Sequence, residues 1–249
     1  MKKNVLISIG SIVFVWLIWI VLYFCIQNDY LLPSFWETFS KMGTLLAGAE
    51  FWIAFLNTLL RTLLSFAVSL VIGVVLALSA RLFSAVRAFL VPIVSIMRTL
   101  PTMAIILILL LWTNPSVAPV VVSMLVLLPA VYAAALAAFD ETEERYGVLA
   151  NVYNVSLKNK VFKMYLPLCV PPLVTQAGGI LSLGIKITVS GEVLSSTYKS
   201  IGGLMQNAKM FVDVPTLLAL TLITLLLGFL LEGGCYFVGK KLARWRNEA

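Results

Sequence analysis

The sequence contains no histidine and only three cysteines among its 249 residues. Without histidine, the chain cannot form a Ser-His-Asp or Cys-His nucleophile pair, a zincin metal site or a histidine-ligated haem. Cys25, Cys169 and Cys235 stand singly inside apolar runs, which favours neither a disulfide framework nor a CxxC site. We therefore expect no catalytic residue and no metal site in this chain.

Charged residues are also scarce. They make up 12% of the chain, and apolar residues make up 61%, whereas soluble domains have about 25% and about 45–50%. From Thr99 to Phe139 no side chain is charged across 41 consecutive positions. Because a membrane-spanning helix needs about 20 apolar residues, this run alone holds two spans. The composition predicts an all-α, polytopic membrane protein.

The few charges are predominantly basic, with 18 Lys and Arg against 11 Asp and Glu and a net charge of +7. Such an excess can attract nucleic acid, but the cytoplasmic loops of membrane proteins are also rich in Lys and Arg. Topology accounts for the excess, so we expect contact with a lipid bilayer and no nucleic-acid partner.

Six apolar segments are long enough to cross a bilayer. The first follows Lys2-Lys3 and exceeds the roughly 7–15 apolar residues of a secretory signal peptide, so we take it as a span. The expected spans cover about 5–26, 51–80, 88–112, 116–138, 164–194 and 214–239. With no separate soluble segment or obvious repeat, residues 1–249 are predicted to form a single transmembrane domain.

The distribution of Lys and Arg orients these spans. With both termini in the cytoplasm, 12 of the 18 basic residues lie on the inner side, 3 lie in outer loops and 3 lie within spans. The positive-inside rule therefore predicts cytoplasmic N- and C-termini. The polar block 140–163, between the fourth and fifth spans, then faces the cytoplasm.

Polar residues inside apolar spans are candidates for a solute pathway. In the fifth span, Thr175, Gly179, Ser182, Lys186 and Ser190 are three or four residues apart and share one helical face. Such a stripe either lines a cavity or dimer seam or packs closely against another helix. Lys186 favours the cavity or seam, because a charged lysine facing lipid costs about 2.5–3.5 kcal/mol.

Three further charges lie within spans. Arg98 precedes Pro101, which disturbs the third span, and Arg98 either faces the pathway or reaches the membrane interface. Glu192 lies about 120° around the helix from Lys186, so the two do not neutralise each other. Glu232, near the inner end of the sixth span, is expected to reach the membrane interface or to pair locally, in a structural role. The pathway candidates are Arg98, Ser182, Lys186, Ser190 and Glu192.

The polar block 140–163 has the pattern of surface helices rather than of a membrane span. It predicts a short amphipathic helix over 141–153, ended by Asn154 in the left-handed conformation, and a basic helix over 158–165 that stops at Leu166-Pro167. Two such surface helices suit either docking into a partner's groove or binding to anionic lipid. The candidate contact residues are Tyr146, Leu149, Ala150, Tyr153, Asn154 and Lys158.

Several short motifs recur together from Phe51 to Arg246. They are Asn57-Thr58-Leu59 with Arg61, Arg98-Thr99-Leu100-Pro101, Leu111-Trp112, Leu166-Pro167, Glu192, Gly202-Gly203-Leu204 and the basic end 240–246. In this combination the sequence resembles the integral membrane permease of bacterial binding-protein-dependent ABC importers, in its nitrate, sulfonate and taurine branch. That family carries a cytoplasmic motif with Glu-Ala-Ala, three further residues and a glycine. Here these positions hold Val148-Leu149-Ala150 and Asn154, and Glu143 and Glu144 are the candidates to replace the missing Glu.

The resemblance implies a type I importer fold in the bacterial inner membrane. It further implies a second permease subunit that makes a homodimer, two cytoplasmic ATPases that bind ATP and Mg, and an extracytoplasmic substrate-binding protein. The chain has no Gly-rich Lys-Ser/Thr phosphate loop, so we expect neither a cofactor nor ATP hydrolysis here. The expected solute is small: a sulfonate, a nitrate-like anion or a vitamin precursor.

Two other functions stay open from the sequence. An ion-coupled secondary carrier would use Arg98, Lys186 and Glu192 as its ion site and would need no ATPase. An intramembrane enzyme would use Ser182 and Lys186 as a nucleophilic dyad, a spacing that often arises by chance.

Overall fold

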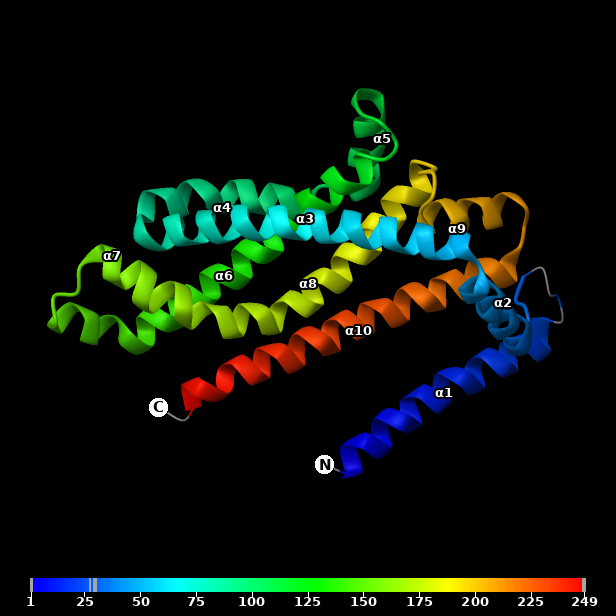
Figure 1. Ribbon diagram of the computed structural model, residues 1–249, viewed down its shortest axis with the longest axis horizontal. Helices are drawn as coiled ribbons and strands as arrows, with labels where there is room; N and C mark the ends of the chain where they lie inside the picture. Colours follow the sequence, from blue (N-terminus) through cyan, green and yellow to red (C-terminus); the bar gives the residue numbers. More distant parts are fainter. Residues whose placement is uncertain (1, 27, 29–30, 248–249) are drawn as a thin grey trace.

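Every regular element in the described part of the chain is a helix (Figure 1). The computed structural model describes residues 2–26, 28 and 31–247. The helices are α1 (Lys2–Ile26), α2 (Phe35–Ala47), α3 (Ala49–Leu82), α4 (Ser84–Thr99), α5 (Thr102–Trp112), α6 (Ala118–Val152), α7 (Leu157–Asn159), η1 (Lys160–Tyr165), α8 (Leu166–Leu194), α9 (Ile201–Met210) and α10 (Val214–Asn247). The all-α prediction is confirmed.

Four long helices form the body of the molecule. Helices α3, α6, α8 and α10 contain 34, 35, 29 and 34 residues. At 1.5 Å per residue they are roughly 44–53 Å long, which exceeds the roughly 30 Å hydrocarbon core of a bilayer. Helix α3 packs on α6, α6 on α8 and α8 on α10, and Figure 1 shows them along the long axis. Within the described residues these four qualify as membrane spans, and they correspond to the predicted spans 51–80, 116–138, 164–194 and 214–239.

The predicted span over 88–112 is not a single helix. These residues form α4 and α5, whose axes differ by 91°. Leu100 is extended, with ψ at 128°, as is usual before proline, and Pro101 has no N–H with which to continue the helix. Helix α5 projects from the bundle in Figure 1. The bent pair is a broken span or a re-entrant segment, and counting it as one raises the number of spans in the described residues to five.

The predicted first span, 5–26, coincides with α1. Within that helix, Trp16–Ile26 forms a shorter apolar segment. The total of six spans and the side of the membrane on which the termini lie stay predictions.

The block 140–163 is not a pair of separate helices, contrary to the prediction. Residues 141–152 continue α6 without a break, because residues 130–146 contain no glycine or proline that would end the helix. After a short connection, α7, η1 and α8 follow one another through Leu166-Pro167. Pro167 lies in the first turn of α8, and the wider π-helical turn of η1, in which the Leu166 N–H donates to the Val161 oxygen, accommodates it. We call residues 140–163 the hairpin.

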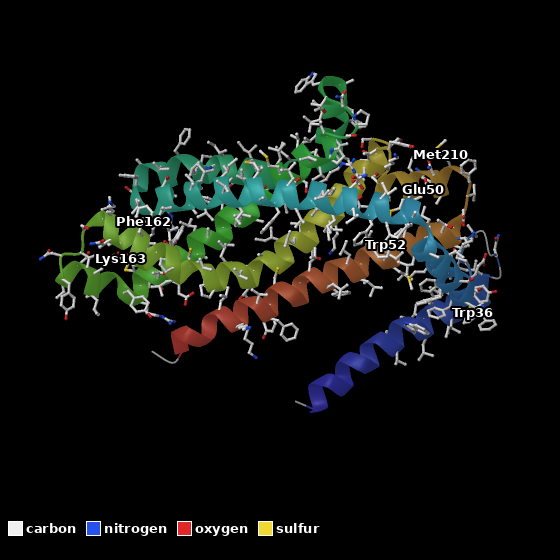
Figure 2. The ribbon with its side chains drawn as sticks, in the orientation of Figure 1. Trp36, Glu50, Trp52, Phe162, Lys163 and Met210 are labelled. Carbon is white, nitrogen blue, oxygen red and sulfur yellow. The ribbon has the colours of Figure 1, made fainter. Side chains whose placement is uncertain are left out.

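The molecule has two distinct ends. Figure 1 shows α2 and α9 at one end and the hairpin at the other, and the free ends of α1 and α10 point toward the hairpin end. Figure 2 places Phe162 and Lys163 at the hairpin end and Trp36, Glu50 and Met210 at the opposite end. We call the latter the α9 end. This arrangement agrees with termini and hairpin on one side of a membrane.

Asp213 fixes the start of α10 at the α9 end. Its carboxylate accepts hydrogen bonds from the Thr216 N–H at 3.1 Å and the Thr216 hydroxyl at 2.7 Å, and the Lys41 ammonium on α2 lies 3.7 Å away. Burial alone would raise the pKa of Asp213, but these hydrogen bonds and the charge of Lys41 outweigh it, so the pKa is lowered.

Candidate translocation groove and coupling hairpin

A groove runs between α8 and α10 and contains a cavity of about 410 Å³. Three residues that the sequence assigned to the pathway, Ser182, Lys186 and Ser190, line it from α8. Thr221 and Thr224 add hydroxyl groups from α10. The other lining residues are Ile185, Val189, Met205, Leu225, Gly228, Phe229 and Glu232. The groove therefore has polar groups on both walls and an apolar lining between them.

Glycines bring the two walls together. A Cβ at Gly178 would come within 2.8 Å of the Glu232 Cα, and a Cβ at Gly228 would come within 2.8 Å of the Ser182 Oγ. Ser182 is buried at this contact, whereas Lys186 and Ser190 are exposed. Part of the polar stripe on α8 thus packs against α10, and the remainder opens into the groove.

Lys186 is an exposed charge within an apolar helix. Among the described residues it has no ion-pair partner. An ammonium group that faced lipid at this position would cost about 2.5–3.5 kcal/mol. This face of α8 is therefore suited to water or protein rather than to lipid.

Glu192 lies away from the groove, in a fully buried cluster. The Thr58 hydroxyl lies 2.8 and 3.0 Å from its two carboxylate oxygens, and Arg61 Nη1 donates to Oε1 at 2.9 Å. The Gly202 N–H donates to Oε2 at 3.2 Å, and the Ile201 N–H donates to the Thr58 hydroxyl at 3.0 Å. The structure separates Glu192 from Lys186 and gives the carboxylate partners on α3 and α9.

The partnership of Arg61 with Glu192 could not be read from local periodicity, because the two residues lie 131 positions apart in the sequence. The one signal for it is that each is a rare charge inside an apolar span, where an unpaired charge is costly. That signal indicates that a partner is needed but does not identify it.

Gly202 and Gly203 let α9 sit directly on this cluster. A Cβ at Gly202 would overlap the Glu192 Cβ and lie 2.6 Å from the Val193 nitrogen, and a Cβ at Gly203 would overlap the Thr197 carbonyl oxygen. The Ser200 hydroxyl caps α9 by accepting from the Gly203 N–H at 2.9 Å. The close approach of α9 to α8 therefore accounts for Gly202, and the contact with the connection between α8 and α9 accounts for Gly203.

Arg98 does not line the groove. It lies on α4, and its Nη2 donates to the Pro129 carbonyl oxygen of α6 at 3.3 Å, just before the bend between α4 and α5. The structure thus brings three of the five pathway candidates together and places Arg98 and Glu192 elsewhere.

Asn154 ends α6 in the predicted conformation, with φ at 50°. The Val155 N–H donates to the Ala150 oxygen at 2.9 Å, and the Asn154 N–H donates to the Asn151 oxygen at 3.0 Å. These two bonds are those of a Schellman motif, in which asparagine can replace the usual glycine. The chain therefore reverses at the position where the related motif has its glycine.

The hairpin carries exposed apolar side chains around this turn. Of the predicted contact residues, Ala150 is buried, Tyr146 is half-buried, and Leu149, Tyr153, Asn154 and Lys158 are exposed. We define the hairpin patch as the exposed apolar residues Val148, Leu149, Val152, Tyr153 and Leu157. Its largest member, Tyr153, is 76% exposed.

An ionic cluster at the base of the hairpin was not predicted. Arg81 lies 3.6 Å from Asp140 and 3.3 Å from Glu143, and Arg87 lies 3.0 Å from Asp140. The Tyr165 hydroxyl donates to Glu143 at 2.5 Å. These contacts tie α6 to α3, α4 and η1. Of the two candidates to replace the missing Glu of the motif, Glu143 is held in this cluster and Glu144 is exposed.

Among the described residues, no group of three His, Cys, Asp or Glu residues is arranged to hold a metal ion.

Comparison with known proteins identifies the class to which this arrangement belongs. Residues 69–244 match the family model described as "Binding-protein-dependent transport system inner membrane component". The chain is 23% identical over 258 residues to the taurine transport system permease protein TauC of Escherichia coli (strain K12), covering 100% of this chain and 92% of that protein.

Two solved structures of the MetNI methionine ABC transporter, both in inward facing conformations, have similar folds. The first gives a TM-score of 0.62 at 18% identity, over 78% of this chain and 94% of the other. The second gives 0.62 at 17% identity, over 85% and 99%. Since the family match covers more than half of the sequence, the ion-coupled carrier is set aside. The chain belongs to the inner membrane components of binding-protein-dependent transport systems, and it is a permease subunit of an ABC importer of the bacterial inner membrane.

Proposed function

We propose that the groove between α8 and α10 is this subunit's wall of the solute pathway. The observation that carries the proposal is the exposure of Lys186 and Ser190 within an apolar helix, beside a cavity of about 410 Å³. That volume falls in the range of about 300–1,000 Å³ that is usual for small-molecule sites. Arg98 and Glu192, which lie outside the groove, act on the pathway only through the packing of α4, α6 and α9.

A second copy of the permease supplies the opposite wall. A homodimer places the exposed faces of the two α8 helices around a shared path, which removes Lys186 from contact with lipid. Water and solute then occupy the space between the subunits.

The solute is small and polar, and a sulfonate is the best-supported class. The relative TauC is named for taurine transport. The ammonium of Lys186 and the hydroxyls of Ser190, Thr221 and Thr224 provide donors suited to an oxyanion.

The hairpin patch receives a separate ATPase subunit, which binds ATP and Mg. Helix α6 is longer than a bilayer is thick, so its last turns extend beyond the hydrocarbon, where exposed apolar side chains indicate a protein partner. The ionic cluster around Arg81 joins the hairpin to α3 and α4, so a displacement of the hairpin moves these helices with it. A substrate-binding protein delivers the solute at the opposite, α9 end.

Thiol labelling tests the groove directly. In a variant whose three native cysteines are replaced, Ser190→Cys is predicted to react with a membrane-impermeant maleimide in the assembled importer. The matched control is Leu60→Cys, at a similar depth on α3 and 62% exposed, which is expected to face lipid and to stay unlabelled. If neither cysteine reacts, the groove is not a water-filled path.

A further inference from the structure

Glu232 lies in the groove and has no role in the function proposed above. It is exposed on α10 and lines both the cavity of about 410 Å³ and a neighbouring cavity of about 600 Å³ toward the hairpin end. In the described part of the chain its carboxylate has no ion-pair partner. The local ion-pair partner, one of the two expectations for this residue, is therefore absent from the described residues. An unpaired carboxylate within an apolar helix is a candidate for contact with the transported solute.

Glu232 and Lys186 lie at different depths of the same groove. Gly178 packs against the Glu232 Cα. Lys186 is eight residues farther along α8, which corresponds to about 12 Å along the groove at 1.5 Å per residue. A small solute therefore encounters the two charges one after the other, Lys186 toward the α9 end and Glu232 toward the hairpin end.

We infer that the groove selects solutes that carry both a positive and a negative group and have no net charge, such as amino-sulfonates and amino-carboxylates. A simple anion is attracted by Lys186 and repelled by Glu232. A simple cation is attracted by Glu232 and repelled by Lys186. Because the groove is partly enclosed by apolar side chains, each repulsion is stronger than in water. A zwitterion can turn as it moves, so that it presents the opposite charge to each residue in turn. This inference rests on the proposed pathway and narrows its substrate class.

Uptake by proteoliposomes that contain the complete importer and its binding protein tests this selectivity. The two probes are 2-aminoethanesulfonate, a zwitterion, and 2-hydroxyethanesulfonate, an anion of nearly the same size. Glu232→Gln is expected to raise anion uptake relative to zwitterion uptake by about tenfold, since it removes a like-charge contact. Lys186→Gln is expected to shift the ratio in the opposite direction. Because the binding protein is the same in all variants, a change in the ratio arises in the permease.

A second measurement does not depend on what the binding protein carries. The thiol of Ser190→Cys is modified in the assembled importer with an anionic or a cationic methanethiosulfonate reagent, and the two rates are compared. Adding Glu232→Gln is expected to increase the anionic rate relative to the cationic rate severalfold, and adding Lys186→Gln to decrease it. Glu37→Gln, an exposed acid on α2 outside both the groove and the hairpin, is the control and is expected to leave the ratio unchanged.

The outcomes separate this inference from the function on which it rests. If Ser190→Cys reacts but neither Glu232→Gln nor Lys186→Gln changes the ratio of rates, the inference is overturned and the pathway stands. If Ser190→Cys does not react at all, the pathway fails and the inference fails with it.

Discussion

The buried cluster around Glu192 at the α9 end and the hairpin patch at the other end differ in whether their side chains find partners within the chain. At the α9 end, Glu192 is fully buried and meets Arg61, Thr58 and Gly202 within the same chain. At the hairpin end, Leu149 and Tyr153 are 60% and 76% exposed and lie beyond the length that a bilayer requires. Groups that are satisfied within the chain stabilise the fold, whereas uncovered apolar groups are available to a partner. We therefore compare the Glu192 cluster, as a source of stability, with the hairpin patch, as the surface proposed for coupling.

Glu192→Ala should cost the most stability. It leaves the Arg61 guanidinium without its carboxylate and removes the acceptor for the Gly202 N–H, and breaking a buried ion pair typically costs about 3–5 kcal/mol. We expect a large drop in the melting temperature of the detergent-solubilised permease. Glu144→Ala, on the exposed surface of the hairpin, is the matched control and should melt like the wild type. If the two variants melted at the same temperature, the Glu192 cluster would contribute no more to stability than the hairpin surface does.

Gly202→Ala should have the next largest effect. The added methyl group would overlap the Glu192 Cβ, and inserting a methyl into a well-packed site usually costs about 1–3 kcal/mol. Gly43→Ala is the control, because a Cβ at Gly43 in α2 would meet nothing within 4 Å. We expect the melting temperature to fall for Gly202→Ala only. A normal melting temperature for Gly202→Ala would show that α9 is not held against α8.

Two substitutions at Asn154 should change the melting temperature less, and the two should differ in the size of that change. Asn154→Val places a β-branched residue in the left-handed conformation, which costs about 1–2 kcal/mol. Asn154→Gly restores the usual residue of the motif and should be neutral or slightly stabilising. Melting of the two variants side by side checks this order, and a more stable valine variant would contradict the observed turn.

The hairpin patch should contribute least to stability and most to coupling. Because Leu149 and Tyr153 are exposed, the double variant Leu149→Ser, Tyr153→Ser should change the free energy of unfolding by no more than about 0.5 kcal/mol. The same variant should lose binding-protein-stimulated ATPase activity in the reconstituted importer. Retained stimulation would show that the partner docks elsewhere.

The sequence was most informative where a local rule decides the structure. The apolar runs predicted α3, α6, α8 and α10, and the position of Asn154 predicted the left-handed turn. The different angular positions of Lys186 and Glu192 on α8 predicted that the two charges do not neutralise each other. Each of these inferences needs only the composition or periodicity of one segment.

Inference from the sequence failed where distant segments decide the outcome. Pro101 indicated a disturbance, but a turn of 91° between α4 and α5 depends on how the two helices pack. Pro167 was expected to stop a helix, yet the π-helical turn before it lets the helix continue. The partner of Glu192 and the exposure of Glu232 in the groove depend on neighbours far away in the sequence.

The central claim is that the hairpin is the surface on which a separate ATPase acts. Its most direct test is a photo-crosslinking amino acid at Val152, which is 71% exposed in the hairpin patch, compared with one at Val71, which is 66% exposed on α3. We predict that, in the assembled importer, Val152 crosslinks to the ATPase subunit and Val71 does not. A crosslink from Val152 to the substrate-binding protein, or none to the ATPase, would contradict the claim.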